Sequence, residues 1–172
     1  YRPKSAGEMN VGSGLKPLPV IVVVHGGAWV YGNKDVYQFY GMRLAQRGFA
    51  VVNYSYRLAP ETRFPASIQD TENVFRWISD NAQKYGLDTK NVFAVGDSAG
   101  GHLLSLYASA LTNSEYRQNF PFIGEKNLTL RGVALNCGKY KMDVGLDKDP
   151  QMSMLIEALI PNKGTKEELR LI

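Results

Sequence analysis

The feature that most constrains the fold is a short apolar run that ends in Gly-x-Ser-x-Gly and continues into a helical pattern. It reads VFAVGDSAGG over residues 92–101. A strand that turns sharply into a helix holds its corner residue, Ser98, in a strained backbone conformation, and flanking glycines remove the side chains that would clash there. The sequence therefore predicts a nucleophile elbow. The Ser98 hydroxyl would stand exposed above the strand end, and the first N–H groups of the helix would point at an anion formed beside it.

Strands and helices alternate along the rest of the chain. Residues 19–24 form a continuous β-branched run and residues 49–54 a second apolar run, both typical of strands buried on two faces of a sheet. Helical spacing predicts helices over about 36–48, 66–85 and 98–111, and a further strand is expected over 130–137. This alternation favours an α/β fold with a doubly wound, mostly parallel sheet covered by helices on both faces. We expect residues 1–172 to form a single domain.

The chain changes character after residue 138. Residues 150–160 are an apolar helix candidate, and the sequence TKEE at 165–168 opens a last helix with a capping-box pattern. Helices that follow a sheet strand often lie over the strand ends. The segment 139–172 is therefore either a lid or cap over the site, or an ordinary pair of helices packed on the sheet.

Composition excludes several classes of function. The chain has 172 residues, of which 44% are hydrophobic and 21% charged, as in one soluble globular domain. No run approaches the ~20 apolar residues of a membrane span, and no secretory signal pattern is visible, so we expect a cytoplasmic protein. The chain starts at Tyr1 without Met, which suggests an incomplete N-terminus. Lys and Arg are scattered despite a net charge of +4, so a nucleic-acid partner is not expected.

Cofactor chemistry is not indicated either. No Cys/His or carboxylate group has metal-ligand spacing, and no glycine-rich phosphate loop is present, so we expect no metal and no cofactor. The one cysteine, Cys137, excludes an internal disulfide and is expected to be a buried strand thiol. The sequence does not indicate an oligomeric state.

Three ordered motifs carry a resemblance to a known family. They are HGGAW at 25–29, YRLAPE at 56–61 followed by Phe64 and Pro65, and GDSAGGHL at 96–103. Together they resemble the α/β-hydrolase fold, and within it the esterase and lipase branch related to hormone-sensitive lipase and to bacterial carbohydrate-ester esterases. The resemblance implies acyl transfer to water from a small-molecule ester. It also implies that Ser98 is the nucleophile and that the N–H groups of Gly26, Gly27 and Ala99 form an oxyanion hole.

The chemistry of these residues agrees with the resemblance. A serine hydroxyl is a weak nucleophile until a base removes its proton, and the tetrahedral intermediate places negative charge on the former carbonyl oxygen. Gly26 and Gly27 follow a buried strand directly and can bring their amides close to that oxygen, because they have no side chain. Ala99 is the residue after the nucleophile, whose amide serves this role in the fold.

The acid and base that would complete a triad are not found. In this fold both follow the nucleophile along the chain, and the only histidine there is His102, one helical turn further on, where it is expected to point toward packing or solvent. His25 is expected to shape the oxyanion loop, and Asp97 to be a structural hydrogen-bond acceptor in the turn. We therefore expect the catalytic Asp and His, and the last strands of the sheet, to lie outside these 172 residues, and the piece alone to be inactive.

The resulting functional prediction is a serine carboxylesterase. The short connections leave little room for a long acyl tunnel, which favours small acyl groups, with acetylated carbohydrates as one option. Trp29 and Tyr31 could line the substrate pocket or simply pack the loop. Two alternatives stay open at this stage: a non-catalytic binding protein that keeps the fold, and an amidase or formamidase that uses the same oxyanion chemistry.

Overall fold

A parallel β-sheet of four strands forms the centre of the computed structural model, which describes residues 1, 16–124, 126–144, 148–160, 162 and 164–172. The strands are β1 (Leu18–Val24), β2 (Ala50–Tyr54), β3 (Leu87–Asp97) and β4 (Leu130–Asn136). Their spatial order is β2-β1-β3-β4, and every neighbouring pair is parallel. The predicted α/β class and parallel sheet are confirmed.

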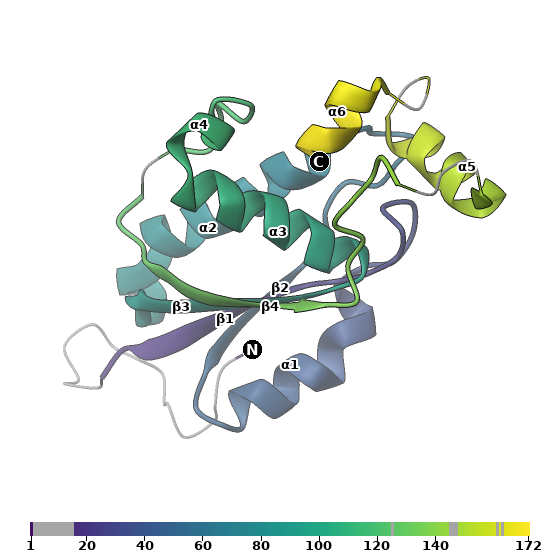
Figure 1. Cartoon of the computed structure of the whole chain (residues 1–172). Helices are drawn as coiled ribbons and strands as arrows, with labels where there is room; N and C mark the ends of the chain where they lie inside the picture. Colours follow the sequence, from purple (N-terminus) through teal and green to yellow (C-terminus); the bar gives the residue numbers. More distant parts are fainter. Residues whose placement is uncertain (2–15, 125, 145–147, 161, 163) are drawn as a thin grey trace.

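Helices cover both faces of this sheet (Figure 1). The elements are the short 3-10 helix η2 (Lys34–Tyr37) and the helices α1 (Gln38–Ala45), α2 (Ala66–Tyr85), α3 (Ala99–Thr112), α4 (Ser114–Arg117), α5 (Pro150–Leu159) and α6 (Lys166–Leu171). Helix α1 lies on one face, and α2 and α3 lie on the other. The helix predicted over 36–48 is thus divided into a 3-10 turn and a shorter α-helix.

The main core lies between the sheet and helices α2 and α3. Val22 and Val24 of β1 pack there with Phe75 of α2 and with Leu103 and Leu104 of α3, and all five side chains have no more than trace exposure. Continuous β-branched residues give β1 an apolar side chain on both faces, which is why it can occupy the middle of the sheet. A smaller cluster on the other face contains Val23, Val51 and Ala45.

Strand β4 is the edge of the sheet in the described part of the chain. It pairs with β3, and five of its seven residues are exposed. The prediction of a buried thiol at Cys137 is wrong: the strand ends at Asn136, and Cys137 is exposed with a left-handed φ of 52°. An apolar neighbourhood in the sequence does not bury a residue that lies just past the end of an edge strand.

The segment predicted as a lid contains α5 and α6, and residues 145–147, 161 and 163 within it lie outside the described residues. Helix α6 begins with the predicted capping box between Thr165 and Glu168. Helix α5 contacts the loop after β2, because the Phe64 N–H donates to the carbonyl of Leu159 at 3.1 Å. A lid function for this segment stays a prediction. Among the described helices, none combines the length and apolarity needed to cross a bilayer.

Candidate active site

Ser98 occupies the turn between β3 and α3. Its backbone has φ 50° and ψ −114°, and the residue is exposed. A non-glycine residue in this region is strained and persists only where its surroundings hold it. Two hydrogen bonds do so: the Ser98 N–H donates to the carbonyl of Asn136 at 2.8 Å, and the Ser98 carbonyl accepts from the His102 N–H at 3.0 Å. The strained, exposed turn predicted from the sequence is therefore present.

Glycines on either side of Ser98 let α3 pack tightly against the strands. A Cβ atom on Gly96 would lie 2.3 Å from the carbonyl oxygen of Gly100. A Cβ atom on Gly100 would lie 2.2 Å from the carbonyl oxygen of Val24. Both distances are far shorter than any van der Waals contact. Glycine is therefore required at both positions because the backbones of β3, α3 and β1 lie too close together for a side chain, as well as because the chain turns there.

The loop after β1 lies directly beside Ser98. The register pairs Val24 of β1 with Gly96 of β3, so both strands end at the same edge of the sheet. A Cβ atom on Gly26 would lie 3.4 Å from the Cβ of Ser98. The loop then turns through three successive left-handed residues, with φ 124° at Gly27, 47° at Ala28 and 64° at Trp29. Strain of this kind gathers at functional sites.

Gly27 is the residue on which this loop turns. Its carbonyl accepts from the N–H groups of both Val30 and Tyr31, each at 3.0 Å. A Cβ atom on Gly27 would lie 2.0 Å from the carbonyl oxygen of Tyr31. Ala99, the remaining predicted donor, is the first residue of α3, and a helix leaves its first N–H groups without an acceptor inside the helix. The structure thus brings Gly26, Gly27, Ser98 and Ala99 to one edge of the sheet.

The two predicted substrate-contact residues lie in different environments. Trp29 is only 3% exposed, and its indole N–H donates to Nδ1 of His102 at 3.1 Å. Its ring also meets that imidazole edge-on, with ring centres 5.3 Å apart. Tyr31 is 66% exposed. Trp29 therefore packs the loop onto α3, and a contact of either residue with substrate stays a prediction.

Both histidines of the chain are buried in structural contacts. Nδ1 of His25 donates to the Gly26 carbonyl at 2.6 Å, and the ring stacks on Tyr56 with centres 4.1 Å apart. Burial lowers the pKa of His25, and the hydrogen bond to Gly26 acts in the opposite direction. Burial lowers the pKa of His102 to about 4, although the nearby Ile172 backbone opposes this shift. Neither imidazole is hydrogen-bonded to Ser98, so neither is placed as its base.

The depressed pKa of His102 predicts a stability that depends on pH. Its ordinary value is 6.5, so below that pH the unfolded chain takes up a proton that the folded protein rejects until about pH 4. The free energy of unfolding should therefore fall by about 2 kcal/mol between pH 7 and pH 5 because of this one group. Urea titrations at both pH values, on the wild type and on His102→Gln, measure the effect. An equal loss in the two proteins would contradict it.

Asp97 is a hydrogen-bond acceptor in the turn, as the sequence predicts. Its Oδ2 accepts from the hydroxyl of Tyr37 at 2.9 Å. Tyr37 was not a predicted site residue. It lies 60 residues away in the chain and in a segment whose apolar spacing indicated only a helix. Contacts between residues so far apart leave no signal in a single sequence.

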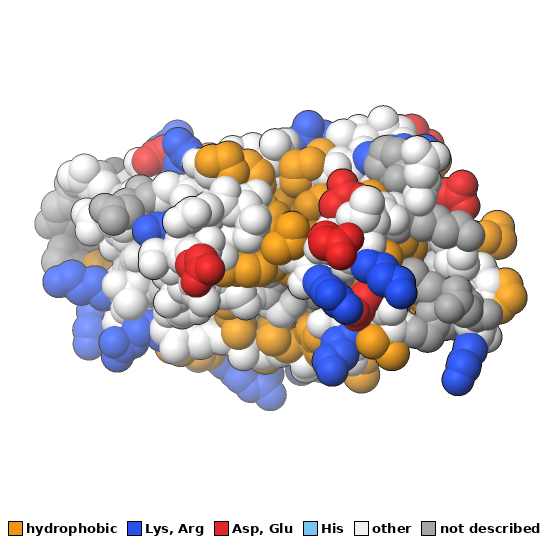
Figure 2. Space-filling view, turned by 45° about the horizontal axis from the view of Figure 1, so that its top comes forward, with side chains coloured by type: hydrophobic (Ala, Val, Ile, Leu, Met, Phe, Trp, Pro, Cys, Tyr) orange, Lys and Arg blue, Asp and Glu red, His pale blue; other side chains and the backbone are white. Residues whose placement is uncertain are grey.

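The visible face in Figure 2 is mixed in charge. Acidic and basic side chains lie close together right of the centre, and hydrophobic side chains lie beside them. Within the described part of the chain, no three His, Cys, Asp or Glu side chains are grouped closely enough to hold a metal ion. The groups that the structure places beside the Ser98 hydroxyl are the backbone of Gly26 and the Asp97 carboxylate, which accepts from Tyr37.

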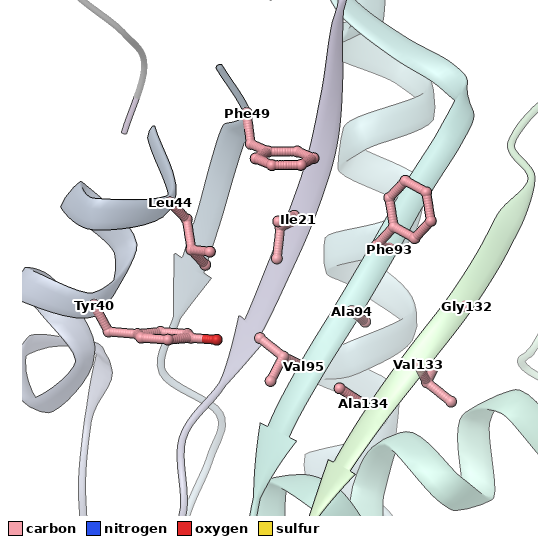
Figure 3. A pocket seen from close by; sticks show the side chains of 10 residues that line it. All are labelled: Ile21, Tyr40, Leu44, Phe49, Phe93, Ala94, Val95, Gly132, Val133 and Ala134. Carbon is pink, nitrogen blue, oxygen red and sulfur yellow. The ribbon is translucent and has the colours of Figure 1, made fainter. Parts of the chain in front are cut away.

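An apolar cavity of about 450 Å³ lies elsewhere, on the sheet face that carries α1 (Figure 3). It is lined by Ile21, Tyr40, Leu44, Phe49, Phe93, Ala94, Val95, Gly132, Val133 and Ala134. Phe93 and Val95 of β3 are on the face opposite to the buried Val92 and Ala94, because side chains alternate along a strand. None of the predicted site residues lines this cavity.

Comparison with known proteins shows the family of the chain. The family model described as BD-FAE matches residues 12–153. Esterase LipC of Mycobacterium tuberculosis is 37% identical over 108 residues, which are 62% of this chain and 27% of that protein. The ethyl acetate hydrolase of Pseudomonas putida is 35% identical over 112 residues, which are 64% of this chain and 33% of that protein.

A solved structure gives the same result for the fold. A crystal structure of inhibited esterase B from Lactobacillus rhamnosis superposes with a TM-score of 0.78 at 29% identity, and covers 96% of this chain and 53% of that one. The chain thus spans about half the length of this solved structure and a smaller part of the curated relatives. The matched family model covers most of the sequence, and the chain therefore belongs to the BD-FAE family, within the hormone-sensitive-lipase-like branch of α/β-hydrolase esterases.

Proposed function

We propose that the protein is a serine carboxylesterase in which Ser98 is the nucleophile. The Ser98 oxygen would attack the ester carbonyl carbon and form a tetrahedral intermediate, and collapse of that intermediate would release the alcohol and leave an acyl-enzyme for water to hydrolyse. The N–H groups of Gly26, Gly27 and Ala99 would bind the oxyanion. In comparable sites one such donor is worth about 3 kcal/mol of transition-state stabilisation.

The observation that carries this proposal is the conformation of Ser98. It is exposed in a strained backbone conformation, at the start of α3 and next to the loop of Gly26 and Gly27. A protein that only binds a ligand has no need of strain at a serine, whereas an attacking hydroxyl must stand clear of the strand. This argues against the alternative of a non-catalytic binding protein.

The base and acid are proposed to come from residues that follow Ile172 in the complete protein. The chain has two histidines, and both are buried in contacts that use their Nδ1 atoms. The depressed pKa values of both also disfavour the imidazolium that a general base must become. The 172 residues alone are therefore proposed to be nearly inactive. The cytoplasmic location expected from the sequence stays a prediction.

Small acyl esters are the proposed substrates. The relative from Pseudomonas putida is named for ethyl acetate, which carries a two-carbon acyl group. The described groups beside the Ser98 hydroxyl are backbone amides and the Asp97 carboxylate, and the ring of the loop residue Tyr31 is exposed. These suit a neutral ester better than an anionic acyl group. Acetylated carbohydrates are one class of such esters.

A chain-length series tests the substrate proposal. We expect kcat/KM of the complete protein on p-nitrophenyl esters to be highest for acetate or butyrate, because the short connections in this chain leave little sequence to build a long apolar tunnel. An acetylated xylo-oligosaccharide and an aryl formamide belong in the same series. A maximum at about twelve carbons or longer would exclude a small acyl pocket. A formamide rate far above that of every ester would move the protein to the amidase alternative.

A further inference from the structure

Tyr37 connects the two halves of the proposed site, although it belongs to neither. It is the last residue of η2, the short helix that follows the loop of Gly26 and Gly27. Its hydroxyl donates to Oδ2 of Asp97 at 2.9 Å, and Asp97 is the residue before Ser98. One hydrogen bond therefore joins the segment after β1 to the turn after β3.

The same carboxylate also lies against the oxyanion loop. A Cβ atom on Gly26 would be 3.0 Å from both the carbonyl oxygen and Oδ2 of Asp97. The backbone of Gly26 also lies near the Tyr37 hydroxyl and lowers its pKa, although burial and Asp97 outweigh this effect. Tyr37, Asp97 and Gly26 thus lie together next to Ser98. Because Gly26 has no side chain, its backbone can lie directly against Asp97.

The hydrogen bond between Tyr37 and Asp97 should persist across neutral and mildly alkaline pH. Burial, together with the hydrogen bond to Asp97, raises the pKa of Tyr37 to about 12. The phenol therefore keeps its proton and keeps donating at neutral and mildly alkaline pH. A hydrogen bond to a charged acceptor is about twice as strong as one between neutral groups, so the carboxylate is a firm anchor for the ring.

We propose that Tyr37 is a positioning residue, which fixes the oxyanion loop relative to Ser98 through its hydrogen bond to Asp97. This inference rests on the proposed function, because it assigns the residue that sets the geometry of that site. Tyr37 itself would touch neither the substrate nor the reacting atoms. A small shift of the loop would move the amides of Gly26 and Gly27 away from the oxyanion, while substrate could still bind.

The test is Tyr37→Phe in the complete protein, which removes one oxygen atom and keeps the ring. We expect kcat for p-nitrophenyl acetate to fall by about 10- to 100-fold with little change in KM, as a displacement of about 1 Å does in other active sites. Labelling by a p-nitrophenyl phosphonate should slow by a similar factor. The matched control is Tyr40→Phe, whose ring lies next to that of Tyr37 and lines the apolar cavity on the α1 face of the sheet. It should leave both rates unchanged.

Variants of Asp97 separate positioning from general loss of stability. Asp97→Asn keeps an acceptor oxygen and should retain most of the activity, whereas Asp97→Ala should lose as much as Tyr37→Phe. The double variant Tyr37→Phe/Asp97→Ala should lose no more than either single variant, because both remove the same interaction. Wild-type kcat in Tyr37→Phe, additive losses, or a change confined to KM would each overturn the inference.

The same assay distinguishes this failure from a failure of the proposed function. If Ser98→Ala is inactive and Tyr37→Phe is fully active, the positioning role alone is wrong. If Ser98→Ala retains the wild-type rate, the proposed function is wrong, and the positioning role is wrong with it.

Discussion

Replacing Ser98 with alanine should abolish ester hydrolysis by the complete protein. The change removes the attacking oxygen and leaves the backbone amides in place, and in other serine hydrolases the loss of the nucleophile costs on the order of 10⁶ in kcat. Alanine lacks only the hydroxyl, and the two backbone hydrogen bonds that hold the turn do not involve the side chain. The fold should therefore survive, which circular dichroism can verify.

Two measurements make this prediction specific. Hydrolysis of p-nitrophenyl acetate gives the rate, and mass spectrometry after treatment with a serine-directed phosphonate locates the adduct. The wild type should carry one adduct on the peptide that contains Ser98, and Ser98→Ala should carry none. Ser109→Ala is the matched control, because Ser109 is exposed on the same helix, three turns away. Turnover that survives in Ser98→Ala, or an adduct on another serine, would refute the assignment.

Replacing Gly100 with alanine should cause the largest loss of stability among the glycine changes of the elbow. Its added methyl group would lie 2.2 Å from the carbonyl oxygen of Val24 and 2.7 Å from that of His25. Both are backbone atoms of the central strand and of the loop, which cannot rotate away as a side chain can. Overpacking of this kind costs about 3 kcal/mol or more, because the helix must move off the sheet.

A glycine with open surroundings provides the control for Gly100→Ala. A Cβ atom on Gly132 of β4 would have one neighbour within 4 Å among the described residues, the Phe93 ring at 3.8 Å. Gly132→Ala should therefore change the free energy of unfolding by no more than about 0.5 kcal/mol. Urea titration followed by far-ultraviolet circular dichroism measures both variants. Equal stabilities for the two would show that α3 does not pack on β1 as closely as described.

The sheet and its longest helix could be predicted from the sequence because local signals agree there. Helix α2 has the predicted bounds, since Gly86 takes the left-handed conformation that ends it, with φ 57° and ψ 50°. The strained turn at Ser98 was likewise predictable, because the residues that force it are adjacent in the chain. Apolar periodicity and glycine positions are properties of short windows, and a single sequence records them directly.

Contacts between distant segments could not be predicted in this way. The indole of Trp29 and the imidazole of His102 are 73 residues apart, and the partners Tyr37 and Asp97 are 60 apart. Each pair meets because β1 and β3 are neighbours in the sheet. Local sequence patterns do not predict the order of the strands in a sheet. The exposure of Cys137 was missed for a related reason, because the sequence does not state that β4 lies at the edge of the sheet and ends before this residue.

In the part of the chain that the structure describes, one side of β4 has no partner strand, and this has a consequence for handling the protein. An edge strand presents unpaired N–H and C=O groups that can accept a strand from another molecule, and most of the side chains of β4 are exposed. The apolar cavity next to β4 extends this exposed surface onto the sheet face, and Phe93 and Val95 line the cavity. A preparation of these 172 residues by themselves should self-associate and precipitate as its concentration rises. Light scattering would show this loss of colloidal stability before any assay of catalysis was attempted.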